Sequence, residues 1–367
     1  MESLELKNFY KGKKVFVTGH TGFKGSWLIC FLHKLGAKVC GYSLEPYTDP
    51  NMFSLIHGEN MVEHHIGDIR DYDHLYAVMK KFQPEIVIHL AAQPIVLTSY
   101  ENPKYTFETN VIGSVNLFEA IRHIDSVRSV VNVTTDKVYL NNDSGKAFVE
   151  SDPLCGYDPY SNSKSCSELV TYSYQNSFFN KKDFGKHHVA ISTCRAGNVI
   201  GGGDWSDYRL IPDCVKSILK GEPVIIRNPH STRPFQHVLE PLYLYLKVAM
   251  LQYNDINYMD NYNIGPEIEN CVSVKEIMDY FVEYEPKAKY IVQHNENAMH
   301  EASKLTLDIT KIKNKLDYKI IYSIKDTIKT IVDWTNEYIS GKDMRKVTEN
   351  QIDDFLHQID IKYKKEK

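Results

Sequence analysis

The sequence predicts an α/β fold, in which a doubly wound parallel sheet is followed by a smaller mixed α/β lobe towards the C-terminus. Short apolar runs rich in β-branched residues alternate with longer stretches whose apolar residues recur at helical intervals. A glycine-rich turn follows the first of these runs and opens a helix. Small and polar residues follow several later runs, at the strand ends where such sheets bind ligands.

The glycine-rich turn lies between the apolar run Val15–Val17 and a helix whose apolar face begins at Trp27. Its three glycines lie three residues apart. Glycine lets a backbone approach a pyrophosphate closely, and a helix N-terminus offers free N–H groups and a partial positive charge. We therefore expect a Rossmann-type, dinucleotide-binding turn, although such a motif can also be only a turn. The cofactor-binding residues predicted here are Gly19, His20, Thr21, Gly22, Phe23, Lys24 and Gly25.

The end of the second strand, expected at 37–43, bears on the choice of cofactor. An acidic residue there usually holds the ribose hydroxyls of NAD, whereas an arginine accommodates the 2′-phosphate of NADP. In this sequence Ser43 ends the strand, Glu45 follows two residues later, and no arginine is close. The pattern favours NAD, with Ser43 as a predicted contact.

Further cofactor contacts are expected after the next two strands. Asp68 and Ile69 follow the third strand, where Asp68 would bind the adenine amino group or else cap the next helix. Ala91 and Ala92 follow the fourth strand, and their small side chains would let a cofactor lie across the strand ends. The elements expected here are a strand at 62–66, a helix at 72–82, a strand at 86–90 and a helix from 102 to 121.

The fifth strand ends in a dense reactive group, Thr135, Asp136 and Lys137. Farther along, Tyr160 and Lys164 are four residues apart at the start of a long helix, so they share one face of it. A free tyrosine titrates near 10, and a lysine cation close by lowers that pKa. Such pairs are common by chance, but here the pair follows both a dinucleotide turn and a hydroxyl-bearing strand end. We predict these five residues to be catalytic, with Tyr160 and Lys164 also contacting the cofactor.

The regular alternation ends after the sixth strand, and the rest of the chain is mixed. The remaining elements are expected as strands at 130–133 and 189–195, helices at 160–179, 210–219 and 239–251, a strand at 224–227, a strand at 262–265 that returns to the sheet, a short segment at 300–308, and a charged tail at 346–367 that is a surface helix or frayed. The predicted division gives an NAD-binding Rossmann domain at 1–195, to which 236–268 returns, and a substrate lobe with the tail at 196–235 and 269–367.

Composition restricts the class of protein. The 367 residues are 43% hydrophobic and 25% charged, which is ordinary for a soluble globular protein and long enough for two lobes. The net charge of -4 gives no reason to expect a nucleic-acid or membrane partner, and no apolar run is long enough to cross a membrane.

The seven cysteines are scattered without a C-x-x-C pair, which disfavours disulfides and zinc and fits a reducing cytoplasm. The doublets His64-His65 and His187-His188 are interpreted as surface or structural, so no metal site is predicted.

Together these motifs resemble the extended short-chain dehydrogenase/reductase family that acts on nucleotide sugars, over roughly residues 13–319. The glycine turn, Thr135 and the Tyr160/Lys164 pair resemble the family as a whole. An acidic residue followed by a second ionisable residue resembles its 4,6-dehydratases, and lysine in the second place, as in Asp136-Lys137, is similar to the CDP-glucose 4,6-dehydratases. The segments that also look like those enzymes are 15–28, 91–94, 198–205 and 233–242.

The resemblance implies an NAD-dependent hydro-lyase that makes deoxysugars for polysaccharides such as O-antigen. It implies oxidation of a hexose at C4, loss of water across C5 and C6, and return of the hydride to C6. Tyr160, held ionised by Lys164, would remove the O4 proton, and Thr135 would hydrogen-bond that oxygen. Asp136 would protonate the departing C6 hydroxyl, and Lys137 would act at C5.

Substrate contacts and partners follow in the same way. Asn198 resembles the family's substrate-contacting asparagine after the sixth strand, and Arg209 and Arg233 are candidates for the substrate diphosphate, where a guanidinium suits phosphate oxygens. Relatives pair through the helices that here carry Tyr160 and Asn110, which implies a homodimer. One departure is the region of Leu97, where the family commonly has arginine; the donor nucleotide and the hexose are therefore less defined than the reaction.

Two other functions remain open from the sequence. One is an NAD-dependent epimerase or simple dehydrogenase of nucleotide sugars, against which the pair Asp136-Lys137 argues. The other is a non-catalytic protein that binds the dinucleotide as a sensor, against which the intact trio of Thr135, Tyr160 and Lys164 argues.

Overall fold

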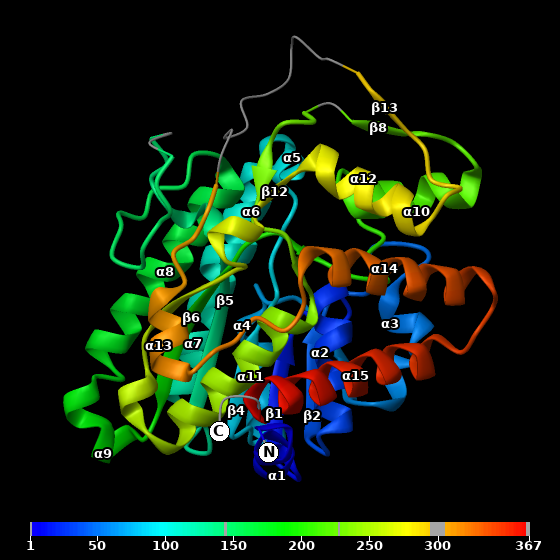
Figure 1. Ribbon diagram of the computed structural model, residues 1–367. Coiled ribbons are helices and arrows are strands. Elements are labelled where there is room, and N and C mark those ends of the chain that lie inside the picture. The colour runs from blue at the N-terminus through cyan, green and yellow to red at the C-terminus, as the bar shows by residue number, and fades with distance from the viewer. Residues whose placement is uncertain (1, 143–144, 227, 294–304, 365–367) are drawn as a thin grey trace.

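The computed structural model describes residues 2–142, 145–226, 228–293 and 305–364 (Figure 1). Its centre is a seven-stranded parallel sheet of order β11-β6-β5-β4-β1-β2-β3. The strand order reverses between β1 and β4, and open α/β sheets bind their ligands at such a reversal. The strands are β1 (Lys14–Thr18), β2 (Lys38–Ser43), β3 (Glu63–Ile66), β4 (Ile86–His89), β5 (Ser129–Thr135), β6 (Ala190–Ala196) and β11 (Asn261–Ile264).

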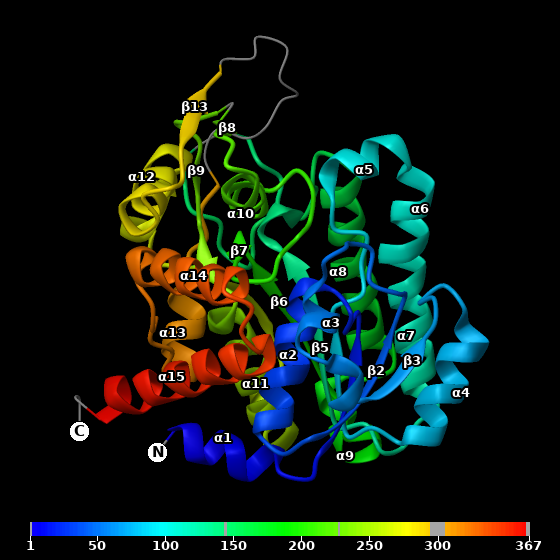
Figure 2. The same cartoon turned by 90° about the vertical axis from the view of Figure 1, so that its right-hand side faces the viewer.

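Helices cover both faces of this sheet, as the strand sequences require (Figure 2). Successive strand residues point to opposite faces, so Val15 and Val17 pack into one apolar cluster and Phe16 into the other. The first cluster lies under α2 (Phe23–Lys34), α11 (Leu239–Asn254) and α15 (Met344–Lys364). The second lies under α4 (Tyr72–Phe82), α7 (Gly113–Arg122) and α8 (Pro159–Ser177).

A smaller group of elements has an apolar cluster of its own, around Ile277, Phe281 and Ile331. Pro234 of this region lies against Gly197, directly after β6, so the region adjoins the carboxyl edge of the sheet. The elements here are β7 (Val199–Ile200), α10 (Leu210–Lys220), β8 (Val224–Ile226), β9 (Thr232–Arg233), β10 (Gln236–His237), β12 (Val272–Ser273), α12 (Val274–Tyr284), β13 (Tyr290–Val292) and α14 (Ile324–Ile339).

The remaining helices complete the chain. The helix expected from 102 to 121 is one rod with a π-helical turn at Glu108–Ile112 between α6 and α7. Among the helices of the described ranges, none combines the length and the apolarity that crossing a membrane requires. The remaining α-helices are α1 (Glu2–Tyr10), α3 (Met52–Leu55), α5 (Val96–Glu101), α6 (Pro103–Phe107), α9 (Phe184–His187) and α13 (Thr310–Leu316).

The expected fold class is confirmed, and the strand expected at 262–265 does return to the sheet as β11, parallel to β6. The tail is not frayed: α15 buries Ile352, Phe355 and Ile359, which its charged composition concealed. The helix α1 was not expected. Arg227, residues 300–304 of the segment expected at 300–308, and residues 365–367 lie outside the described residues. The division into two domains stays a prediction.

Candidate active site

The glycine turn after β1 has two positions, Gly19 and Gly25, that only glycine fits. Gly19 has φ +75°, and a Cβ on it would lie 2.8 Å from the Ala91 nitrogen. A Cβ on Gly25 would lie 2.1 Å from the Gly19 oxygen. Gly22 begins α2 without a side-chain cap, so the first N–H groups of this helix are left for a ligand. This cradle and helix N-terminus fit the pyrophosphate of a dinucleotide.

Thr18 and Thr21 fix the neighbouring strand ends around the turn. The Thr18 hydroxyl accepts hydrogen bonds from the backbone nitrogens of Leu90 and Ala91, both at 3.1 Å, which holds the end of β4 beside the turn. The Thr21 hydroxyl lies 2.8 Å from that of Ser43 and donates to the Leu44 carbonyl, also at 2.8 Å. Two threonine hydroxyls therefore hold the carboxyl ends of β2 and β4, where the cofactor is expected, against the glycine turn.

Asp68 is held by Arg70 and does not cap α4. The guanidinium of Arg70 donates to both carboxylate oxygens, with the shortest bond 2.7 Å, and these bonds lower the pKa of Asp68. Asp71 caps the helix instead, through the His74 nitrogen at 3.1 Å. Ile69 is buried and packs against Gly113. A Cβ added to Gly113 would lie 2.6 Å from Cγ2 of Ile69. Arg70 is a site neighbour that the sequence analysis missed.

His20, in the same turn, turns its side chain into the protein. Its Nε2 lies 2.6 Å from Nδ1 of His64, and its ring packs edge-on against Phe53. Burial, reinforced by His64, lowers the pKa of His20 to about 3, so the ring is neutral. His20 therefore contributes to the turn through its backbone and its packing.

The reactive group at the end of β5 is compact: Thr135 and Asp136 are buried, and the Lys137 side chain is 28% exposed. The Thr135 hydroxyl donates to Oδ1 of Asp136 at 3.0 Å, and Nζ of Lys137 lies 3.4 Å from the same oxygen. Asp136 is fully buried, and its Oδ2 has no hydrogen-bond partner among the described residues. A Cβ on Gly197 would lie 2.7 Å from Cγ of Pro234 and 3.3 Å from Oδ2, so a larger residue at the end of β6 would crowd this oxygen. An unsatisfied buried carboxylate oxygen is costly, and a bound substrate can supply its partner.

Tyr160 is brought to this group by the start of α8. Asp158 caps the helix by accepting from the Ser161 nitrogen at 3.0 Å, so Tyr160 lies in the first turn. Burial raises the pKa of Tyr160, whereas the Lys137 ammonium, a hydrogen bond with Thr135 and Arg209 act in the opposite direction. Lys137 is the strongest of these three.

Lys164 lies on the same side of α8, but its amine is directed to β5. It donates to the Val133 carbonyl at 3.1 Å, and burial lowers its pKa to about 8. Lys24 reaches the same region from the glycine turn. Burial, together with the charges of Lys164 and Arg209, lowers the pKa of Lys24 to about 7. The sequence analysis placed Lys24 at the cofactor but did not foresee its position near Asp136 and Lys164.

The predicted substrate residues are Asn198, Arg209 and Arg233. Asn198 has a buried side-chain oxygen without a partner in the described part of the chain. Arg209 donates to Oδ2 of Asp204 at 3.1 Å, and it is close enough to Tyr160 to affect its pKa. Arg233 is buried on β9 and donates to the Thr232 carbonyl at 3.0 Å. The structure therefore places Arg209 near the reactive group. Asn198 directly follows Gly197, and Arg233 directly precedes Pro234, which packs against Gly197.

Sequence comparison assigns this arrangement to a family. The family described as GDP-mannose 4,6 dehydratase matches residues 16–331. The chain belongs to this family. The expected nucleotide-sugar dehydratase class, a hydro-lyase, is thereby confirmed.

Individual relatives agree with the dehydratase family. The chain is 45% identical to the CDP-glucose 4,6-dehydratase of Salmonella typhimurium, over 95% of this chain and 98% of that protein. A dTDP-glucose 4,6-dehydratase from Bacillus anthracis, solved in complex with NAD, superposes with a TM-score of 0.71 at 20% identity, over 92% of this chain and 100% of that one. An epimerase from Methanothermobacter thermautotrophicus superposes with a TM-score of 0.76 at 23% identity, over 94% and 98%. The two structural matches show the shared fold.

Proposed function

We propose that this protein converts CDP-glucose to CDP-4-keto-6-deoxyglucose with NAD as its cofactor. The observation that carries the proposal is the pair formed by the buried Asp136 and the partly exposed Lys137, which lies beside Tyr160 in a chain 45% identical to a CDP-glucose 4,6-dehydratase. An epimerase or a simple dehydrogenase needs the tyrosine and the cofactor, but it has no use for an added acid and base.

The residues of the cofactor site fit NAD. The turn from Gly19 to Gly25 would hold the pyrophosphate, and Ser43, Asp68, Ile69, Ala91 and Ala92 would line the adenosine and strand-end regions. Ser43 and Glu45 offer no cation to a 2′-phosphate, which favours NAD over NADP. When bound, NAD would take hydride from C4 of the sugar and later return it to C6.

Tyr160 would accept the proton of the sugar O4 hydroxyl. Its phenolate is favoured by Lys137, Thr135 and Arg209, against the effect of burial. Thr135, which lies within hydrogen-bond reach of Tyr160, would bind the same sugar oxygen and hold it in line. Lys164, fixed on the Val133 carbonyl, would hold a positive charge beneath the cofactor site.

Asp136 and Lys137 would carry out the loss of water. Nζ of Lys137 lies 3.4 Å from Oδ1 of Asp136, so the ammonium would first pass a proton to the carboxylate and become a neutral amine. Oxidation at C4 makes the C5 proton acidic, and the Lys137 amine would remove it. Asp136, then a carboxylic acid, would protonate the departing C6 hydroxyl, and Oδ2, which lacks a partner in the described residues, can carry that proton. Asn198, Arg209 and Arg233 would bind the sugar and the diphosphate, where planar guanidinium groups suit phosphate oxygens.

The test is a reaction with CDP-glucose deuterated at C4, followed by mass spectrometry and proton NMR. We expect deuterium at C6 of a 4-keto-6-deoxy product, without accumulation of free NADH. Stoichiometric NADH release would indicate a dehydrogenase, and deuterium restored to C4 with inversion would indicate an epimerase. A preference of tenfold or more in kcat/KM, about 1.4 kcal/mol, for a dTDP-, UDP- or GDP-sugar would overturn the choice of nucleotide. That comparison also tests the consequence of Leu97.

We propose further that the protein works in the cytoplasm, in the synthesis of deoxysugars for polysaccharides such as O-antigen. We also propose that two copies pair through α8 and the helix that carries Asn110. Large apolar side chains are exposed on these helices: Ile112 is 50% exposed, Leu169 54% and Tyr172 64%. Large apolar side chains that gather on one exposed face are typical of a protein interface, and these three support the proposed pairing. Light scattering on the purified protein should give twice the chain mass, and Leu169→Glu should give the mass of one chain.

A further inference from the structure

A second group of ligand-type side chains lies at the edge of the sheet, on β2 and β3. In the parallel register Cys40 pairs with Glu63, and His65 follows two residues later. Residues two apart on a strand point to the same face, so these three side chains share one face of the sheet. That face is covered by α4, since Cys40 packs into the same apolar cluster as Met79. His64, between them, points to the other face and meets His20.

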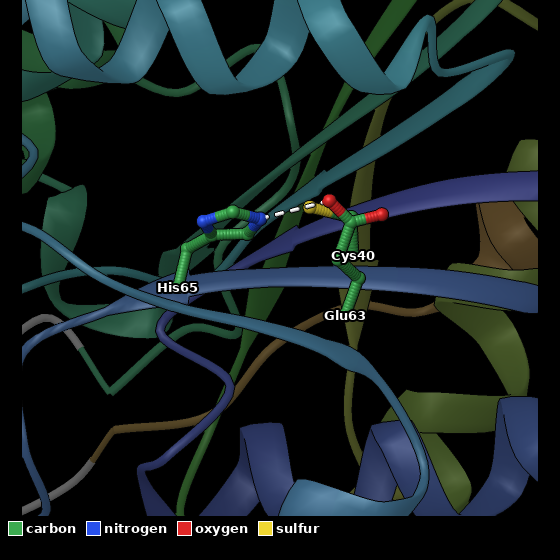
Figure 3. A group of neighbouring side chains, drawn as sticks. All are labelled: Cys40, Glu63 and His65. Carbon is green, nitrogen blue, oxygen red and sulfur yellow. Dashed lines mark hydrogen bonds and ion pairs between the residues drawn. The ribbon is translucent and has the colours of Figure 1, made fainter.

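The three side chains converge. One ligand atom from each, the Cys40 sulfur, a Glu63 oxygen and a His65 nitrogen, lies within 4.8 Å of the other two. Nε2 of His65 is 3.0 Å from Oε1 of Glu63, and Figure 3 shows these groups pointing toward one another beside the sulfur. Metal–ligand bonds of about 2.0–2.3 Å in a tetrahedral zinc site place ligand atoms roughly 3.3–3.8 Å apart. Small side-chain rotations are therefore enough to admit an ion.

The surroundings favour an ion that bonds to sulfur. Cys40 is fully buried, whereas the Glu63 and His65 side chains are 45% and 25% exposed, so an ion can enter from solvent. Glu63 also lines an open groove of ≈ 530 Å³. The ligand set decides the choice of metal. A thiolate, imidazole and carboxylate set suits zinc, which forms strong bonds to all three.

We propose that Cys40, Glu63 and His65 bind one Zn²⁺ ion, with the fourth position open to water. Both β2 and β3 contribute ligands, and β3 is a four-residue strand at the edge of the sheet. A zinc ion there ties the edge strand to its neighbour and stabilises the folded protein.

The experiment uses the full chain, freed of metal with a chelator and titrated with Zn²⁺ against a chromophoric indicator. We expect one ion per chain and a Tm that rises with zinc concentration. Co²⁺ in place of Zn²⁺ should show the near-ultraviolet charge-transfer absorbance of a cobalt–thiolate bond. Cys40→Ser and His65→Ala should each weaken zinc binding tenfold or more, and Glu63→Gln should weaken it less.

Matched variants separate this site from chance binding. Cys155 is an exposed thiol, and His123 lies 3.1 Å from Glu119 in a similar His–Glu contact without the cysteine. Cys155→Ser and His123→Ala should therefore keep full zinc binding. His65 and Glu63 are partly exposed, so their variants test the site even if Cys40→Ser does not fold. Zinc binding unchanged in His65→Ala, binding lost in Cys155→Ser, or no cobalt–thiolate absorbance would each overturn the proposal.

Discussion

Two buried polar groups meet α8 one turn apart, one around Glu168 and the other around Lys164 and Asp136. They differ in how fully their hydrogen bonds are satisfied. Glu168 accepts from Nε and Nη2 of Arg195, both at 2.9 Å. Thr134 and Thr193 add hydrogen bonds to its two oxygens at 2.5 Å and 2.9 Å. The guanidinium of Arg195 also donates to the Tyr139 hydroxyl at 2.8 Å. This group is complete without any ligand.

The predicted catalytic group, which includes Lys164 one turn earlier on α8, has fewer of its hydrogen bonds satisfied. Lys164 has a backbone carbonyl as its partner and a pKa lowered by burial, and Oδ2 of Asp136 has no partner in the described residues. Buried groups left without partners cost stability, and they persist where function requires them. The comparison indicates that the Glu168 group maintains the fold, and we predict that a substrate completes the hydrogen bonds of the Asp136 group.

The largest effect should come from Asp136→Asn. General acid–base groups contribute about 10²–10⁴-fold, so dehydration of CDP-glucose should slow by that factor. The Tm should change little, because an asparagine keeps the shape of the side chain and Oδ2 of Asp136 has no partner in the described residues to lose. Turnover at the wild-type rate, or a clear loss of Tm, would contradict the assignment.

Glu168→Gln should lower the stability of the fold, whereas Asp136→Asn should lower activity. Removing one partner of a buried ion pair leaves the other charge uncompensated, and it costs about 3–5 kcal/mol. We expect that loss in the free energy of unfolding by urea, measured with the cofactor absent. If the stability of Glu168→Gln equals that of the wild type, the network does not maintain the fold.

Lys164→Met should change how stability depends on pH. Burial lowers the pKa of Lys164 from 10.5 to about 8 in the folded protein. Between these values the unfolded chain binds a proton that the folded protein does not, so the free energy of unfolding rises with pH across this window. Below pH 8 Lys164 is protonated in both the folded and the unfolded state, so the folded protein carries the full free-energy cost of burying its charge. The variant should lack this rise and be more stable at pH 7 by about 1–3 kcal/mol, as measured by unfolding from pH 7 to 10.5.

The smallest effect should come from Thr193→Val. Thr193 donates one of several hydrogen bonds to Glu168, and a valine keeps its shape. Arg195 and Thr134 would still satisfy the carboxylate, so the loss should be about 1 kcal/mol in the free energy of unfolding. A loss as large as that of Glu168→Gln would show that the hydrogen bonds of this network cannot be separated.

The features that could be predicted from the sequence are those set by residues close together in the chain. The strand ends and the glycine turn follow from apolar periodicity and residue spacing, so the fold and residues such as Thr135 and Tyr160 could be predicted. The Glu168–Arg195 pair could not, because it joins a helix to a strand with no spacing rule between them. Lys164 shares a helix face with Tyr160, yet its amine bonds to a carbonyl of β5 that no sequence pattern indicates.

The packing of α1 has a consequence for the order of events during synthesis. Ser3 on α1 is hydrogen-bonded to Asp360 on α15, 357 positions away, and Tyr10 donates to the carbonyl of Leu246 on α11. Both partners of the first helix are therefore among the later parts of the chain to leave the ribosome. At about 5–20 residues per second, the wait for α15 is roughly 20–70 s. During that time the apolar side of α1, which includes Leu6, is uncovered and open to chaperones.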